Sequence, residues 1–246
     1  MKVTIAPITA NWASIALAGP KARDLLAILK PNFDFSNEAF PHMRFHEGKI
    51  SDVRARVARV SFTGELQYEI SVPARYGASL LEIALKIGSD TGAHLVGMEA
   101  WLRLRLEKGY IHVGLDTNGR TTPLNIGMGP IVSKKQTDFI GKRSLSLPFA
   151  TSVEREQLVG LRSKTGPVPI GGRILAVGTI RPPCTTVGYV TSACISPSAG
   201  NIGMALIERG TECMGEIVRI FDDGRIVEAE ICSPVFVDSN NERLRQ

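Results

Sequence analysis

The chain has 246 residues, of which 43% are hydrophobic and 22% charged, and its formal net charge is +5. This is an ordinary globular balance, which excludes a disordered or fibrous chain. The basic residues are scattered and form no run, so we expect no nucleic-acid partner. The sequence has no apolar run of about 18 residues and no readable secretory signal. It therefore predicts a cytoplasmic protein of one or two domains without a membrane partner.

Metal and disulfide chemistry have little support. The four cysteines stand at positions 184, 194, 213 and 232 without a CxxC pair, and no histidine follows position 112. A zinc finger needs two close ligand pairs, so we expect no metal site and free thiols that are buried or half-buried. His42 and His46 are four residues apart, but no carboxylate pattern completes a site with them. We interpret both as surface or packing residues.

The first half of the chain begins with a strand and a helix. Residues 12–18 have the pattern of a buried strand. Residues 20–30 carry apolar side chains at the i, i+3, i+4, i+7 spacing of an amphipathic helix, with proline at its first position. Three further strand patterns follow, at residues 43–50, 53–62 and 67–72.

A second helix is expected after Pro73, with Gly88 as its stop. Residues 94–96 then have the composition of a short closing strand. This order of elements predicts a ferredoxin-like split βαβ domain of the α+β class. Residues 97–107 read as a third helix, which Gly109 can cap in the left-handed conformation.

After about residue 150 the composition changes to short β-rich runs separated by turn signals. The runs are residues 157–162, 173–177, 187–193, 202–207, 215–221 and 225–231. Six strands of this length and spacing predict a small antiparallel β-barrel or jelly-roll-like domain. We therefore expect two domains, 1–150 and 151–246, with the glycine-rich residues 110–149 connecting the two bodies.

Several ordered stretches resemble a known family. They are residues 17–22, 59–73, 104–114, 121–127, 138–143 and 188–197. Together they resemble the folate-binding aminomethyltransferase family, which includes the glycine cleavage T-protein and the C-terminal domain of the sarcosine oxidase alpha subunit. The wording Glu-Lys-Gly-Tyr-Ile-His-Val-Gly at 107–114 is most similar to the sarcosine oxidase branch.

The resemblance implies tetrahydrofolate as the cofactor, bound in a central cavity between domains, and transfer of a one-carbon unit at the formaldehyde level. It also implies that Glu69 holds the pterin, because the family's pterin-binding glutamate stands after the Thr-Gly turn. A carboxylate can accept two parallel N–H bonds from the edge of a pterin. Tyr68 is a neighbouring candidate, although it should point to the opposite face of the strand.

Two more candidates for cofactor binding lie in the third helix. Trp101 stands where T-proteins have an arginine that helps to hold the folate, and its ring can stack on a pterin or pack in the core. Arg105 matches an arginine within the family motif. Its alternative is a structural ion pair with Glu99 or Glu107.

The sequence also departs from the family pattern. The family has an N-terminal stretch, with the aspartate that steers the chemistry at N5, upstream of the first match. Asp34, Asp52 and Asp116 lie in no matching motif, so we predict no catalytic residue. The family's C-terminal tyrosine has no counterpart after Pro234. A first domain without that stretch would expose apolar faces and strand edges, so we expect an obligate oligomer or a partner subunit.

The leading hypothesis is a folate-dependent one-carbon transferase of the aminomethyltransferase or sarcosine oxidase alpha type. It would work as a homo-oligomer or in a hetero-complex with an amine-oxidising flavoprotein subunit, since the chain has no dinucleotide fingerprint. The alternative is a non-catalytic folate-binding or scaffolding member of the same fold. A third possibility is a demethylase of this fold that acts on another methyl donor.

Overall fold

The computed structural model describes residues 2–135, 137–178 and 183–246. Its contacts divide the chain into two compact units. The first unit comprises Met1–Trp101 with Asn240–Gln246, and the second comprises Leu102–Ser239. The predicted domain boundary at residue 150 stays a prediction. No helix within the described ranges combines the length and the apolar character that a membrane span requires.

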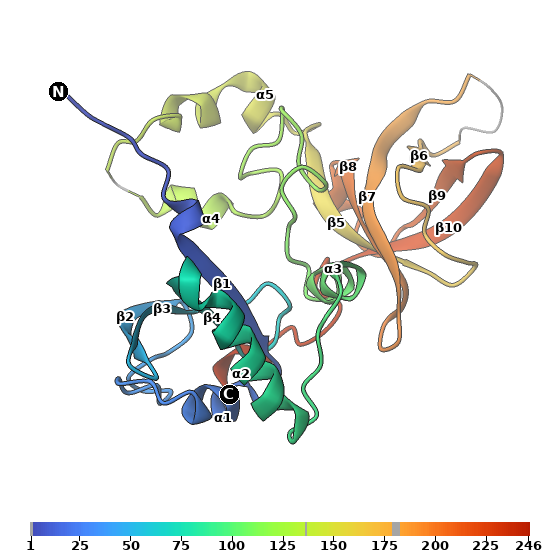
Figure 1. Cartoon of the computed structure of the whole chain (residues 1–246). Helices are drawn as coiled ribbons and strands as arrows, with labels where there is room; N and C mark the ends of the chain where they lie inside the picture. The colour runs from blue at the N-terminus through green and yellow to red at the C-terminus, as the bar shows by residue number, and fades with distance from the viewer. Residues whose placement is uncertain (1, 136, 179–182) are drawn as a thin grey trace. The chain divides into compact units, whose positions relative to one another are not determined.

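The first unit is built on a four-stranded antiparallel sheet of order β1-β4-β3-β2 (Figure 1). Its strands are β1 (Trp12–Ala18), β2 (Arg44–Ile50), β3 (Val53–Arg59) and β4 (Gln67–Pro73). All four lie where the alternating patterns predict them. β3 ends at Arg59, three residues earlier than expected, and Gly64, with a φ of +82°, lies in the turn before β4.

One face of this sheet carries the core of the first unit. The helices are α1 (Ala22–Ile28) and α2 (Gly77–Ser89), with short 3₁₀ turns η1 (Thr9–Asn11), η2 (Ala74–Tyr76) and η5 (Arg243–Arg245). Buried side chains from both helices pack on those of the central strands: Ala22, Leu26, Leu29, Leu80, Val57, Tyr68, Ile70 and Val72. α2 lies so close to β1 that a Cβ on Gly77 would come within 2.5 Å of the Cβ of Ala13. Helix α2 ends one residue beyond the predicted stop at Gly88.

The expected closing strand at residues 94–96 is wrong. These residues form no regular element, and Leu95 and Val96 are 73% and 61% exposed. The fourth strand of the sheet is β4, which precedes α2 and pairs antiparallel with β1 over seven residues. The composition of this three-residue run suits a strand, but the run pairs with none of the four strands of the sheet. The α+β class is confirmed, while the split βαβ order is replaced by β-α-β-β-β-α.

The second unit contains a closed antiparallel barrel of strand order β10-β5-β8-β7-β6-β9. Its strands are β5 (Glu156–Ser163), β6 (Arg173–Leu175), β7 (Thr186–Ser196), β8 (Gly200–Glu208), β9 (Ile217–Asp222) and β10 (Arg225–Cys232). All six predicted strands are confirmed. Short alternating runs close into a barrel because the inward side chains of every strand share one apolar interior.

The other helical elements are short. They are α3 (Met98–Glu107), α4 (Gly129–Ser133), η3 (Lys142–Ser146), α5 (Pro148–Thr151) and η4 (Gly210–Glu212). The predicted left-handed cap of α3 is confirmed, since Gly109 has a φ of +73°. Tyr110 N–H donates to the carbonyl of Arg105 at 2.8 Å, which closes the helix end in the usual way for such a cap.

Candidate functional site

Glu69 lies in the middle of β4, on the sheet face opposite to the helices. Its neighbours across the ladder are Ala16 of β1 and Ala58 of β3, and directly paired residues point to the same face. The Glu69 side chain is exposed. The carboxylate of Glu69 therefore stands between two small side chains on this face.

A short hydrogen-bond chain orients this carboxylate. Thr63 Oγ1 donates to Gln67 Oε1 at 3.2 Å, and Gln67 Nε2 donates to Glu69 Oε1 at 3.3 Å. Gln67 is only 3% exposed. Because the Thr63 hydroxyl donates to the amide oxygen of Gln67, the amide nitrogen of Gln67 faces Glu69. Sequence reasoning missed Gln67, although its i, i+2 spacing from Glu69 places both on one strand face.

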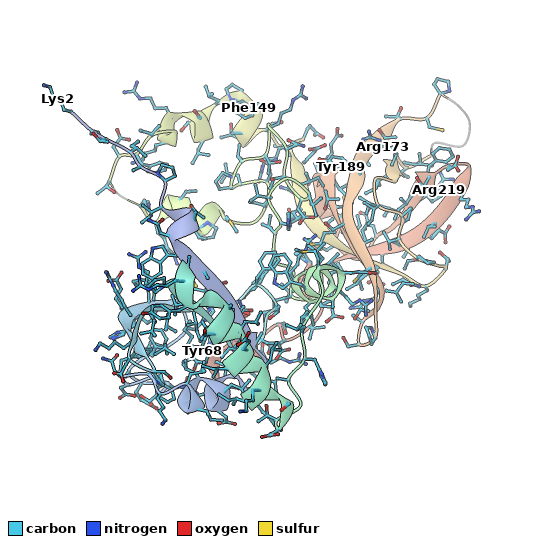
Figure 2. All side chains as sticks on the ribbon, in the orientation of Figure 1. Lys2, Tyr68, Phe149, Arg173, Tyr189 and Arg219 are labelled. Atoms are coloured by element: carbon cyan, nitrogen blue, oxygen red, sulfur yellow. The ribbon has the colours of Figure 1, made fainter. Side chains whose placement is uncertain are left out.

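The structure places Tyr68 on the other face of the same strand, in the core of the first unit (Figure 2). Its ring is fully buried and stacks on Phe40 with centroids 6.2 Å apart. Burial raises the pKa of the Tyr68 hydroxyl, and its oxygen has no hydrogen-bond partner among the described residues. Tyr68 and Glu69 are thus not brought together, and a cofactor contact of Tyr68 stays a prediction.

Trp101 has an aromatic partner within the first unit. Its ring stacks on Phe62 with centroids 4.0 Å apart and an interplanar angle of 26°. The side chain is half-buried, so packing accounts for part of its surface. The expected stacking of Trp101 on a pterin stays a prediction.

Arg105 lies in a fully buried polar network of the second unit. Its guanidinium pairs with Asp116, and it donates to Ser192 Oγ at 2.8 Å. Asp116 has no exposed surface and also accepts from Thr191 Oγ1 at 2.7 Å and from the backbone N–H of His112 at 2.9 Å. The predicted partners Glu99 and Glu107 are therefore wrong. The partner is a loop carboxylate that no sequence motif marks, and the network joins α3 to β7.

The other charges of the family motif are also paired within the second unit. Glu107 accepts from Ser196 Oγ at 2.6 Å, and Lys108 Nζ contacts Asp238 Oδ2 at 2.9 Å. A Cβ on Gly109 would lie 2.5 Å from the carbonyl oxygen of Pro234, so only glycine fits there. Most of the conspicuous charges in residues 104–109 thus hold α3 in the second unit.

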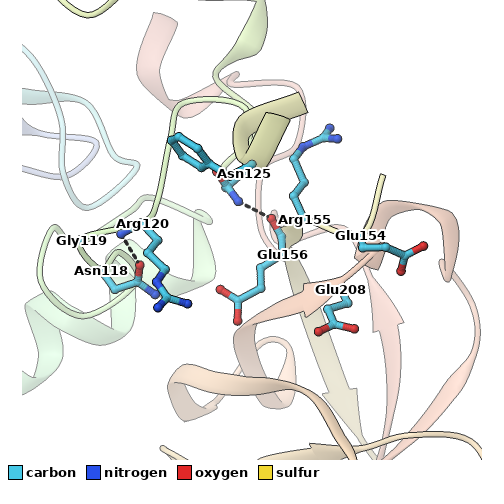
Figure 3. A pocket seen from close by; sticks show the side chains of 9 residues that line it. Asn118, Gly119, Arg120, Asn125, Glu154, Arg155, Glu156 and Glu208 are labelled. Carbon is cyan, nitrogen blue, oxygen red and sulfur yellow. Dashed lines mark hydrogen bonds between the residues drawn. The ribbon is translucent and has the colours of Figure 1, made fainter. Parts of the chain in front are cut away.

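A mixed-charge cavity of about 620 Å³ opens beside the barrel (Figure 3). Its lining includes Asn118, Arg120, Glu156 and Glu208, and the last two face each other across β5 and β8. Burial first, and then the charge of Glu208, raise the pKa of Glu156, while Arg120 opposes the shift. Asn125 Nδ2 donates to the backbone oxygen of Glu156 at 2.6 Å, which fixes one wall.

Thiols and histidines form no metal centre in the described part of the chain. All four cysteines are free, but Cys184 is exposed, so the expectation of buried or half-buried thiols is wrong at that position. Burial is the main cause that raises the pKa of Cys194 to about 11. His46 stacks on Phe33 with centroids 4.3 Å apart, in keeping with a packing residue.

Two family models match this chain. The GCVT N-terminal domain matches residues 1–136, and the glycine cleavage T-protein C-terminal barrel domain matches residues 156–238. The chain belongs to the glycine cleavage T-protein family. The second match covers the closed barrel, and the first match contains both Glu69 and Arg105.

Curated relatives of this family member include aminomethyltransferases and oxidases of methylated amines. The sarcosine oxidase subunit alpha of Rhizobium meliloti is 37% identical over 99% of this chain, which spans 25% of that protein. The aminomethyltransferase of Halothermothrix orenii is 30% identical over 92% of the chain and 61% of that protein. The 4-methylaminobutanoate oxidase (formaldehyde-forming) of Paenarthrobacter nicotinovorans is 30% identical over 96% of the chain and 28% of that protein.

A solved structure shares the fold. The aminomethyltransferase T of the glycine cleavage system from Bartonella henselae superposes with a TM-score of 0.75 at 25% identity. The similarity covers 92% of this chain and 60% of that one. The chain thus spans about a quarter of the sarcosine oxidase subunits and about three-fifths of the aminomethyltransferases it matches.

Proposed function

We propose that this member of the T-protein family binds tetrahydrofolate through Glu69 and takes part in folate-dependent one-carbon transfer. The observation that carries the proposal is the exposed carboxylate of Glu69 between Ala16 and Ala58, with one oxygen held by Gln67. The names of its relatives support it, since they include aminomethyltransferases and a formaldehyde-forming oxidase.

The part of the protein in this reaction is positioning. The carboxylate of Glu69 accepts the paired N–H groups on the edge of the pterin and fixes its orientation. Gln67 keeps the carboxylate in one rotamer. When bound, tetrahydrofolate supplies the amine that accepts a one-carbon unit at the oxidation level of formaldehyde. Trp101, in the same unit as Glu69, remains a candidate for a further contact, and a cofactor contact of Arg105 stays a prediction.

The donor of the one-carbon unit is proposed to be a secondary amine that a flavoprotein subunit oxidises. Three of the relatives are sarcosine oxidase alpha subunits, of which this chain spans about a quarter. We therefore propose that the chain works in the cytoplasm, either in a hetero-complex with that flavoprotein subunit or as a homo-oligomer.

Intrinsic fluorescence tests folate binding, because one of the two tryptophans, Trp12, lies on the same sheet face as Glu69. Titration with tetrahydrofolate should quench the emission, and Glu69→Ala should weaken binding by about 10- to 100-fold through loss of a charge-assisted pair. Glu82→Ala removes an exposed charge from α2 and serves as the control. Equal affinities in the wild type and Glu69→Ala would refute the role of Glu69.

One observation favours the alternative of a folate-binding member without turnover. Asp116, one of three aspartates weighed as catalytic candidates, is buried in the network with Arg105. An assay of one-carbon transfer from an amine-oxidising flavoprotein to bound tetrahydrofolate distinguishes a transferase from a member that only binds folate. Binding that depends on Glu69 without any transfer would identify the non-catalytic member.

A further inference from the structure

Arg59 is a buried charge of the first unit with an unusual set of partners. It stands at the end of β3 and only 1% of its surface is exposed. A buried guanidinium needs hydrogen bonds to most of its N–H groups, because desolvation of the charge is costly. Among the described residues no acidic side chain pairs with Arg59, and burial lowers its pKa.

The partners of Arg59 come from two distant parts of the chain. Nη1 donates to Asn37 Oδ1 at 2.6 Å and to the Phe40 carbonyl at 2.8 Å. Nη2 donates to the carbonyl of Leu244 at 3.1 Å and to the main-chain oxygen of Gln246, the last residue given, at 2.8 Å. Leu244 and Gln246 therefore provide both of these acceptors of Nη2.

Two neighbouring side chains hold the same segment. Arg23 Nη2 donates to the oxygen of Gln246 at 2.6 Å and to Asn37 Oδ1 at 2.8 Å. Asn37 Nδ2 in turn donates to the carbonyl of Arg245 at 2.9 Å. The amide of Asn37 thus links both arginines to the segment, which lies beside α1 in Figure 1.

The segment also has a side-chain anchor. Leu244 is 4% exposed, and Arg243 contacts Glu65 Oε1 at 2.5 Å. The side chains of Arg23, Asn37 and Arg59 donate hydrogen bonds to main-chain oxygens of the segment, and its apolar Leu244 is buried. A groove recognises a short peptide by the same two kinds of contact. More than 180 residues separate Arg59 from this segment in sequence.

We propose that Arg23, Asn37 and Arg59 form a peptide-binding site that residues 243–246 of this chain occupy, and that the first unit depends on this occupant. Without the segment Nη2 of Arg59 loses its acceptors while it remains in the core. The sheet unit, whose strands all lie in the first third of the chain, is then complete only when residues 243–246 are in place.

Limited proteolysis of the full chain tests the site, since Arg243 and Arg245 are cleavage positions for trypsin. In the wild type cleavage after Arg245 should be slow. Asn37→Ala should raise its rate at least about 10-fold, because loss of one main-chain contact and of the link to both arginines frees the segment. Asn11→Ala, at an exposed position of the same unit, is the matched control. Equal rates in all three proteins would overturn the proposal.

A thermodynamic cycle gives a second reading. It compares the full chain, a chain that ends at Glu242, Arg59→Met, and the two changes together. In the wild-type background, truncation should lower the melting temperature by more than about 5 °C. In the Arg59→Met background, truncation should lower it by less than half as much. A synthetic peptide of residues 240–246 should restore the truncated chain, and a scrambled peptide should not.

Equal shifts in both backgrounds would show that Arg59 and the segment are independent, which contradicts the proposal. If the truncated chain does not fold, the trypsin rates in the full chain decide. None of these measurements involves folate, so their failure is distinct from failure of the proposed function.

Discussion

Gln67 is the side chain that decides how Glu69 meets a ligand. Its amide nitrogen lies 3.3 Å from Glu69 Oε1, and its own orientation is set by Thr63. Because Thr63 already fixes the buried amide of Gln67, the amide can donate to Glu69 without a further conformational cost when a ligand binds. The exposed carboxylate is therefore pre-oriented by a buried neighbour.

Gln67→Leu should weaken tetrahydrofolate binding by about 5- to 10-fold, which corresponds to about 1 kcal/mol, the typical net contribution of one hydrogen bond. The residue acts on orientation, so Gln67→Asn, with a shorter side chain, should not restore affinity. Fluorescence titration of both variants beside Glu69→Ala measures this. Unchanged affinity in Gln67→Leu would contradict a positioning role.

The four thiols should differ in reactivity. Cys184 is exposed, whereas burial is the main cause that raises the pKa of Cys194 to about 11 and also raises the pKa of Cys232. Since the thiolate is the nucleophile, we expect one fast reaction with an aromatic disulfide reagent at pH 8 in the native protein. Cys184→Ser should remove this fast phase. Persistence of the fast phase in that variant would assign it to another cysteine.

α3 is joined to the barrel by buried charge. Arg105 and Asp116 are 2% and 0% exposed, and their side chains are completed by hydroxyls of β7. Such a pair adds little net stability when it is complete, but removal of one partner leaves an uncompensated charge. We therefore expect residues 104–109 to vary little among relatives, because their buried contacts constrain them even without a role in catalysis.

Asp116→Ala should destabilise the protein by about 3–5 kcal/mol, because Arg105 is left buried without its carboxylate. Combining it with Arg105→Met should recover a large part of this loss, since the unpaired charge is gone. Chemical unfolding of the two single variants and the double variant measures the coupling. Simple additivity of the two losses would contradict the buried pair.

Like charges face each other where β5 and β8 pair at the cavity of Figure 3. Burial and Glu208 raise the pKa of Glu156 above its unfolded value. The folded chain then binds this proton more tightly than the unfolded chain. The contribution of protonated Glu156 to the free energy of unfolding is fully present below the pKa of the unfolded chain. It is lost as the pH rises through the pKa of the folded chain.

Glu156→Gln should therefore raise the melting temperature at pH 7 and leave it unchanged near pH 3.5, because the neutral amide mimics the protonated acid. Glu82→Gln on the exposed face of α2 should change neither value. Melting curves at the two pH values provide the comparison. A lower melting temperature at pH 7 would indicate that Glu156 is stabilised as a carboxylate, contrary to the raised pKa.

The whole molecule should respond to folate by mass action. A ligand that binds only the folded chain adds about 2.7 kcal/mol at a concentration of 100 times its Kd, which shifts the melting temperature of a chain of this size by several degrees. We expect this shift with tetrahydrofolate in the wild type and its loss in Glu69→Ala. A shift of equal size in both proteins would place the binding site elsewhere.

Much of the architecture could be predicted because local patterns and packing agree. Residues 12–18 alternate as a strand, and the same residues form β1; the six runs after position 150 all become barrel strands. The prediction for residues 94–96 failed because a strand-like composition does not ensure that so short a run pairs with a sheet edge. A short run does not reveal which edges of a sheet are free.

The amino-acid sequence by itself determined the α+β and barrel classes, the glycine cap at Gly109 and the candidate Glu69, since each depends on local geometry or on an ordered motif. The partners of buried charges were decided only by tertiary structure. Asp116 reaches Arg105 from a loop, and the last residues reach Arg59 from the far end of the chain. A buried cation needs acceptors within hydrogen-bond distance, and only the folded chain brings residues so distant in sequence to that distance.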